Sequence, residues 1–335
     1  ILPGTNLGGF EQSSLKIMKI FKDSGIIPII ISISPFGLLK EKIDKNKIES
    51  YSLGKNSLLN IFTLIRLIII IKPDKIIMTG HSILGLIVLG LFFRDIKKTL
   101  SIHYHHKGLK NLYVWRLYYF LSSRTYSSII FCSNYIRDEA ISIYPSIAQQ
   151  SVKINNPIYK VPISSKKDKK LSREKYNISS SVKVIGGAGW LIERKRFDIP
   201  IRILCELTKL EENYILLIAG DGPLKNRLIK LANKLKIGSR IKWIGWQDSL
   251  DDFFNCLDFM IFSSEIDAMG LVPLEALVRN IPTFCSVRHG GLKEILNEDF
   301  SYFIHNNHDV HTIVNKIMEH NEHKDKVELV SKCGN

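Results

Sequence analysis

Cysteine is scarce in this sequence of 335 residues, and no two cysteines lie close together. The five are Cys132, Cys205, Cys256, Cys285 and Cys333. Disulfide frameworks and structural zinc sites are recognised by cysteines at short spacings such as Cys-x-x-Cys. That spacing is absent, so the sequence indicates neither a disulfide framework nor a zinc site. Widely spread, reduced thiols are typical of a cytoplasmic protein.

The sequence also lacks an apolar run long enough to cross a membrane. Its two most apolar segments, residues 61–71 and 83–93, are interrupted or flanked by Arg66, Lys72 and Arg94. A membrane-spanning helix needs ~20 mostly apolar residues. Both segments are shorter, so we predict that they form buried core helices. No signal peptide is recognisable at the start of the chain.

Acidic residues are few in the first half of the chain. Residues 1–180 carry 27 Lys and Arg against 11 Asp and Glu, a net charge of +16. Residues 181–335 carry 20 against 21, a net charge of −1. A basic face attracts polyanions, either nucleic acid or an anionic membrane surface. A general bias toward lysine is the alternative explanation, but it would have raised the charge of both halves.

Length and periodicity predict two α/β domains. The hydrophobic content of 45% is that of a globular protein, and the chain is long enough for two cores. In the first half we predict strands at 26–33, 75–78, 99–102 and 128–131, and helices at 11–23, 57–71, 82–93, 112–122 and 135–143. The pattern restarts with a strand at 182–189. Alternating strands and helices form parallel, doubly wound, Rossmann-like sheets, whose ligands bind at the carboxyl ends of the strands.

A polar segment separates the two predicted domains. Residues 161–180 are charged and show no apolar periodicity, which indicates a linker. The linker divides an N-terminal domain, residues 1–160, from a C-terminal domain, residues 181–335. The sequence begins without methionine and ends in a helical pattern that starts at Asp309, so we expect further residues beyond both ends.

The most informative stretch is FSSEIDAMGLVPLEALVRNIPTFCSVRHGGLKEIL, residues 262–296. A strand ends at Phe262, a loop with Asp267 and Gly270 follows, and the apolar spacing then predicts a short helix that carries Glu275. Backbone N–H groups ahead of a helix attract phosphates, and carboxylates accept hydrogen bonds from sugar hydroxyls. The alternative is an ordinary strand–loop–helix unit whose acidic residues bind nothing.

This stretch resembles the donor-binding signature of retaining glycosyltransferase family 4, the glycosyl transferases group 1, which have the GT-B fold. The matching residues are Asp267, Met269, Gly270, Glu275, Ala276, Pro282, Gly290, Gly291 and Glu294. This sequence has Asp267 where the family usually has glutamate, and Met269 where it usually has phenylalanine.

Three further motifs extend the resemblance. Gly8 and Gly9 match a family Gly-Gly that lies against the donor phosphates and the acceptor, and His103 matches a histidine near the transferred sugar. The family motif Gly-Arg-x-x-x-x-Lys is matched by Gly189 and Lys195, but Trp190 occupies the arginine position. The run HYHH at residues 103–106 lacks the spacing of metal ligands, so we predict no metal site there.

The resemblance implies two Rossmann-like domains that face each other across a cleft and transfer a hexosyl group with retention of configuration. The donor is a nucleotide-sugar, and the acceptor is the hydroxyl of a glycan, either a lipid-linked or a cell-surface polysaccharide precursor. The implied catalytic residues are His103, Lys195 and Asp267. The implied donor-binding residues are Gly8, Gly9, Arg194, Met269, Gly270, Leu271 and Glu275.

The expected cofactors and partners follow from the same resemblance and from the charge difference between the two halves of the chain. No metal and no cofactor are expected, because the nucleotide-sugar is itself a substrate. The basic first half predicts an anionic membrane surface as a partner, which implies a peripheral position on the cytoplasmic face of the membrane. No nucleic-acid-binding motif is recognisable. The alternative function is that of a catalytically inactive GT-B paralogue acting as a binding protein.

Overall fold

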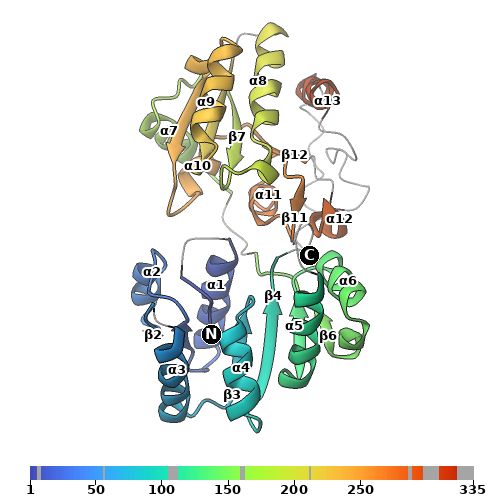
Figure 1. Ribbon diagram of the computed structural model, residues 1–335. Coiled ribbons are helices and arrows are strands. Elements are labelled where there is room, and N and C mark those ends of the chain that lie inside the picture. Colours follow the sequence, from blue (N-terminus) through green and yellow to red (C-terminus); the bar gives the residue numbers. More distant parts are fainter. Residues whose placement is uncertain are drawn as a thin grey trace. The chain divides into compact units, whose positions relative to one another are not determined.

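The computed structural model describes residues 1–5, 9–55, 57–104, 112–158, 163–210, 213–285, 289–296 and 309–322. The chain divides into two compact units, Ile1–Pro157 and Ile158–Asn335 (Figure 1). Every described strand pair is parallel. Parallel strands joined by helices confirm the predicted α/β class of doubly wound, Rossmann-like sheets.

The first unit contains a parallel sheet in the order β3-β4-β5-β6 and a strand pair β1-β2. The strands are β1 Ile29–Ser32, β2 Glu49–Ser52, β3 Lys75–Thr79, β4 Lys97–Ile102, β5 Ser128–Phe131 and β6 Ser151–Lys153. The backbone of Ile1 and Leu2 lies between the two groups. Leu2 N–H donates to Ile31 O at 2.8 Å, and Thr79 N–H donates to Ile1 O at 2.9 Å. These bonds join the strand pair to the larger sheet.

The helices of the first unit fall close to where the apolar periodicity predicts them. They are α1 Gly9–Asp23, α2 Lys40–Lys45, α3 Ser57–Ile71, α4 Ile83–Phe92, α5 Leu112–Thr125 and α6 Asn134–Ile143. Ser82 and Ser133 cap α4 and α6 with their side-chain oxygens. Helix α2 and strand β2 were not expected from the sequence. Since β2 is the polar segment ESYS with no buried residue, it carries no period-two signal.

Helices α3 and α4 are not buried core helices, so that prediction is wrong. One face of each packs inward, with Leu64 and Leu89 completely buried. The opposite face is exposed, as in Phe62 at 72% and Leu91 at 62%. Among the described residues, no helix is both long enough and apolar enough to cross a membrane.

The second unit has a five-stranded parallel sheet in the order β12-β10-β7-β8-β9, and a short pair β11-β13. The strands are β7 Lys183–Ala188, β8 Tyr214–Ala219, β9 Ile241–Gly245, β10 Phe259–Phe262, β11 Ile266–Asp267, β12 Thr283–Cys285 and β13 His289–Gly290. The helices are α7 Lys166–Lys175, α8 Asp198–Leu210, α9 Lys225–Lys234, α10 Asp251–Cys256, α11 Leu271–Leu277, α12 Leu292–Ile295 and α13 Val310–Glu322.

Both faces of this sheet are buried, as expected for a doubly wound fold. Successive residues of β8 point to opposite faces. Leu216 and Ile218 join the core cluster that includes residues of α8, α9 and α13, whereas Leu217 joins the cluster that includes residues of α10. Two apolar cores on the two faces hold the central strands rigidly, and this rigidity positions the loops at the strand ends.

The segment predicted as a linker contains helix α7, which belongs to the second unit. Ser165 and Asp168 form a capping box at its start. Arg173, whose side chain is only 7% exposed, and Lys169 each donate to Asp258 at 2.7 Å. Ionic bonds therefore hold α7 where an apolar stripe would usually do so. Apolar periodicity alone could not reveal such a helix, although the capping box was readable in the sequence.

Candidate active site

The candidate site of the second unit lies where the loops after β7 and β10 meet. These two strands are neighbours in the sheet, but the chain continues from them in opposite directions: β8 and β9 lie beyond β7, and β12 lies beyond β10. Open parallel sheets bind ligands at such a switch point, outside the carboxyl ends of the strands. The loop after β7 carries Arg194 and Lys195, and the loop after β10 carries Asp267.

Lys195 and Asp267 form a largely buried ion pair across these two loops. Lys195 Nζ donates to Asp267 Oδ2 at 2.5 Å, and the two side chains are 14% and 16% exposed. Burial disfavours the Asp267 carboxylate, but the charge of Lys195, its hydrogen bond and the N–H of Gly270 together lower the pKa of Asp267. Asp267 is therefore ionised at neutral pH, and its charge holds Lys195 at the switch point.

Asp267 also orders its own loop. Its Oδ1 accepts hydrogen bonds from the N–H groups of Gly270, at 2.8 Å, and Met269, at 3.3 Å. Gly270 has a φ of 74°, and a Cβ there would lie 3.1 Å from the Leu292 side chain, so glycine fits this position best. The sequence predicts that the loop amides face donor phosphates, but in the structure two of them donate to Asp267.

Two serines whose role the sequence did not reveal join the loops. Ser263 Oγ donates to Arg196 O at 2.8 Å, and Ser264 Oγ donates to Arg194 O at 3.3 Å. Both serines are buried, and Glu265 N–H adds a bond of 2.7 Å to Arg194 O. Their signal in the sequence was a pair of small polar residues directly after an apolar strand.

The predicted Gly290 allows a close backbone approach to Asp267. Residues 266–267 pair with residues 289–290 as β11 and β13. A Cβ on Gly290 would lie 1.8 Å from Asp267 O, and its φ of 139° disfavours any side chain. The second glycine-rich part of the signature thus supports the loop that carries Asp267.

The other predicted residues of the second unit lie on the same two connections. Leu271 begins α11, and Glu275 lies one turn further along this helix, half-buried.

Arg194 Nη1 donates to Ile266 O at 3.2 Å, and its charge helps to lower the pKa of Asp267. Trp190 is 58% exposed in the loop after β7. Arg194 is therefore a second cation beside the ion pair, in a chain that lacks the arginine expected at position 190.

His103 belongs to the first unit and follows the last residue of β4. Ser101 Oγ lies 2.8 Å from its Nε2. Burial lowers the pKa of His103 to about 4, against a smaller opposing effect from a hydrogen bond with Asn156. Gly9 begins α1. Gly8 and residues 105–106 of the HYHH run lie outside the described residues.

We expect the His103 imidazole to be neutral at pH 7 and to gain its proton only near pH 4, because burial disfavours the cation. Between the ordinary histidine pKa of ~6.5 and this lower value, the unfolded chain binds a proton that the folded unit does not. Folding stability from this group is therefore lost as the pH falls through that window. NMR titration of the histidine ring protons, assigned with His103→Gln, measures the pKa. Titration near pH 6.5 would contradict the expectation.

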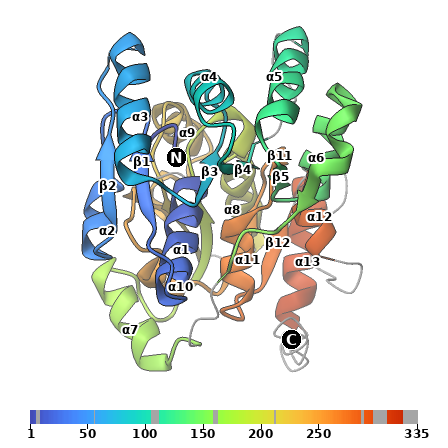
Figure 2. The same cartoon turned by 90° about the horizontal axis from the view of Figure 1, so that it is seen from below.

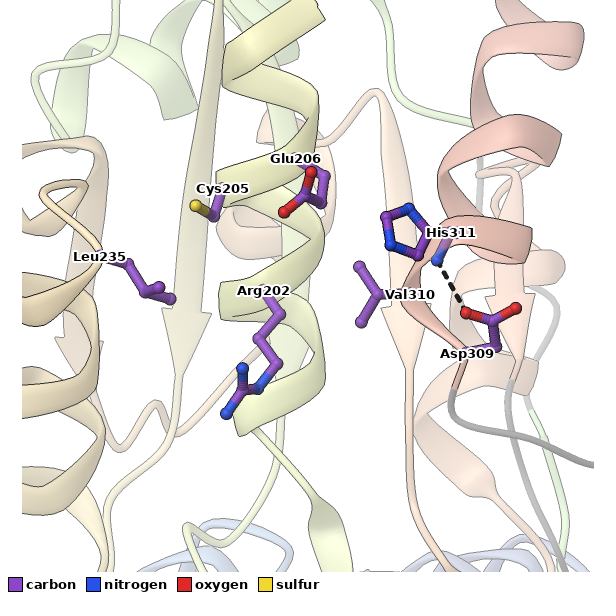
Figure 3. Close-up of a pocket in the computed structure, with 7 residues that line it drawn as sticks. All are labelled: Arg202, Cys205, Glu206, Leu235, Asp309, Val310 and His311. Carbon is purple, nitrogen blue, oxygen red and sulfur yellow. Dashed lines mark hydrogen bonds between the residues drawn. The ribbon is translucent and has the colours of Figure 1, made fainter.

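The second unit also has a hollow of about 310 Å³ between α8 and the start of α13 (Figure 3). Arg202, Cys205 and Glu206 of α8 line one side, and the first turn of α13 lines the other (Figure 3). No residue of the candidate site lines it. The hollow is therefore distinct from the switch point at the ends of β7 and β10.

Comparison with known proteins assigns the class. Residues 168–334 match the family described as glycosyl transferases group 1. The chain is 27% identical over 280 residues to an uncharacterized glycosyltransferase of Methanocaldococcus jannaschii, covering 77% of this chain and 68% of that protein. It is 29% identical over 120 residues to the lipopolysaccharide core biosynthesis glycosyltransferase LpsE of Rhizobium meliloti, covering 36% of this chain and 34% of LpsE.

Solved structures share the fold at low identity. The Anabaena protein HepE in complex with UDP and glucose has a TM-score of 0.84 and 16% identity, covering 100% of this chain and 92% of that one. WaaG, a glycosyltransferase involved in lipopolysaccharide biosynthesis, has a TM-score of 0.72 and 13% identity, with 97% and 91% covered.

The fold is thus GT-B, and the protein is a glycosyltransferase. Residues 168–334, nearly the whole second unit, match the glycosyl transferases group 1 family, as the signature around Asp267 and Glu275 predicts.

Proposed function

We propose that the chain transfers a sugar from a nucleotide-sugar to an acceptor hydroxyl with retention of configuration. The observation that carries the proposal is the Lys195–Asp267 pair, held by the loops of two neighbouring strands at the switch point of the sheet. The family match and the likeness to HepE, solved with UDP-glucose, support a nucleotide-sugar as the donor.

In this reaction the bond from the sugar C1 to the phosphate oxygen breaks, and a bond from C1 to the acceptor oxygen forms on the same face. The acceptor proton passes to the departing diphosphate. Negative charge thus develops on the phosphate, and a positioned cation in a partly buried site stabilises it strongly. Lys195 has three N–H donors, so it can bind a phosphate oxygen while it remains bonded to Asp267.

The other residues take roles that fit their chemistry. Arg194 provides a second cation for the diphosphate in place of the arginine that Trp190 replaces. Glu275 on α11 accepts hydrogen bonds from the nucleotide ribose. Asp267 positions Lys195. Direct contact between Asp267 and the sugar stays a prediction. The predicted roles of His103, toward the sugar and the acceptor, and of Gly8 and Gly9, toward the donor phosphates, stay predictions; His103 would act as a neutral imidazole. Because cationic side chains supply the positive charge, we expect no metal requirement.

We further propose a lipid-linked or cell-surface polysaccharide precursor as the acceptor. LpsE and the Escherichia coli O-antigen biosynthesis glycosyltransferase WclY, relatives of this chain, support this class of product. The net charge of +16 in residues 1–180 supports an anionic membrane surface as a partner. Each Lys or Arg near such a surface contributes about 1 kcal/mol to binding. These features favour a peripheral position on the inner face of the membrane.

A thermal-shift panel of UDP-, GDP- and ADP-sugars tests the proposed donor. A ligand at about 100 times its dissociation constant adds about 2.7 kcal/mol of stability to the folded state. We expect one nucleotide class to raise the unfolding temperature by several degrees, and free sugars to leave it unchanged. No shift with any nucleotide-sugar would contradict the proposal. A shift without release of nucleoside diphosphate, even with acceptor extract present, would favour the inactive binding protein.

A further inference from the structure

Helices α3, α4 and α5 form one side of the first unit. α4 contacts α3 and α5, and the three lie side by side in both views (Figures 1 and 2). Each helix buries one stripe in the unit and exposes another. The exposed stripes are therefore parts of a continuous outer surface, which we call the three-helix face.

The three-helix face is apolar. Of the 24 large apolar side chains that are exposed among the described residues, 13 lie on these helices. They are Leu59, Phe62, Ile69 and Ile70 on α3, Ile83, Ile87, Leu91 and Phe92 on α4, and Leu112, Tyr113, Val114, Leu117 and Leu121 on α5. Many recur at intervals of three or four residues, so they share one side of each helix. Soluble monomers rarely expose contiguous apolar surfaces larger than a few hundred Å².

The charges on this face have one sign. Exposed Arg66 lies within the stripe of α3, and exposed Arg116 and Arg124 lie within that of α5. None of the three helices contains Asp or Glu. An apolar surface interspersed with arginine complements a bilayer with anionic headgroups, because the apolar groups enter the interface while the guanidinium groups stay with the phosphates.

We infer that the three-helix face rests in the surface of an anionic lipid bilayer. This inference rests on the proposed function, because it names the surface through which the enzyme reaches a lipid-linked acceptor. α4 and α5 follow the ends of β3 and β4, the edge of the sheet where His103 lies. At that edge Trp115 of α5 contacts the rings of His81, at 5.3 Å, and Tyr104, at 5.7 Å. Helix α5 is thus packed against the strand ends near His103, the residue proposed to contact the acceptor.

Vesicle co-sedimentation tests the inference with the full chain. The vesicles contain equal parts of phosphatidylglycerol and phosphatidylcholine, or phosphatidylcholine alone. We expect the protein to pellet with the anionic vesicles and much less with the neutral ones. The variant Phe62→Asp/Leu91→Asp/Leu117→Asp should bind at least tenfold more weakly, because charged side chains oppose entry into the interface. The variant Arg66→Gln/Arg116→Gln/Arg124→Gln should lose about fivefold per charge on anionic vesicles only.

The matched control is Ile163→Asp/Leu171→Asp/Leu210→Asp, which changes three exposed apolar side chains of the second unit and should bind vesicles much more tightly than the Asp variant of the three-helix face. Thermal unfolding with and without nucleotide-sugar shows whether each variant is folded and binds its donor. Unchanged vesicle binding by the Asp variant would overturn the inference while leaving the donor proposal intact. Equal binding to both vesicle types would also overturn it. The same holds if sedimentation equilibrium shows a dimer that the Asp variant converts to a monomer.

Discussion

Replacing Lys195 with alanine is expected to lower the rate of sugar transfer about a thousandfold with every accepted donor. Lys195 is the largely buried cation of the switch point, and its charge opposes that developing on the departing diphosphate. An effect that is independent of the sugar is the signature of this role. Initial rates with each donor that the panel identifies provide the measurement. A loss confined to one sugar would mean that Lys195 recognises the sugar instead.

Loss of folding could imitate that result, because the substitution leaves the Asp267 charge without its lysine. Removing one partner of a buried pair typically costs about 3 kcal/mol of unfolding free energy. The double variant Lys195→Met/Asp267→Asn removes both charges, and the asparagine oxygen can still accept from Met269 and Gly270. We expect it to regain stability but not transfer. The matched control is Lys225→Ala, which breaks a more exposed pair with Asp221 in the same unit and should keep full activity.

Replacing Glu275 with alanine is expected to reduce the thermal shift caused by the nucleotide-sugar to half or less. A hydrogen bond to a charged group contributes about 1.5–3 kcal/mol, so the loss of the carboxylate should weaken donor binding about 10- to 100-fold. Glu275 is half-buried on α11, and the fold should tolerate the change. Isothermal titration with the free nucleoside diphosphate measures the affinity without contributions from the sugar.

Two further variants separate the charge of Glu275 from the bulk of its side chain. Glu275→Gln keeps the shape and should also bind the nucleotide weakly. Glu206→Ala removes a carboxylate from α8, outside the candidate site, and should leave the affinity unchanged. An unchanged affinity in both Glu275 variants would exclude this residue from the donor site.

The secondary structure was readable where apolar periodicity was strong. Strand β5 has the predicted bounds, because its buried side chains alternate with partly exposed ones. Helix α7 was missed because ionic contacts with Asp258 hold it. The exposed faces of α3 and α4 were misjudged for a related reason, since a helix that is apolar all round has no period that marks an outer side.

The sequence by itself determined the family and the residues of the signature, because the identity and spacing of those residues are local properties of the chain. It also determined the alternation of strands and helices, and from this the parallel sheets. Only the tertiary structure decided that Lys195 and Asp267 pair, since they lie 72 positions apart and meet through the strand order at the switch point. It likewise decided which side of α3, α4 and α5 is left uncovered, because burial depends on what packs against a helix.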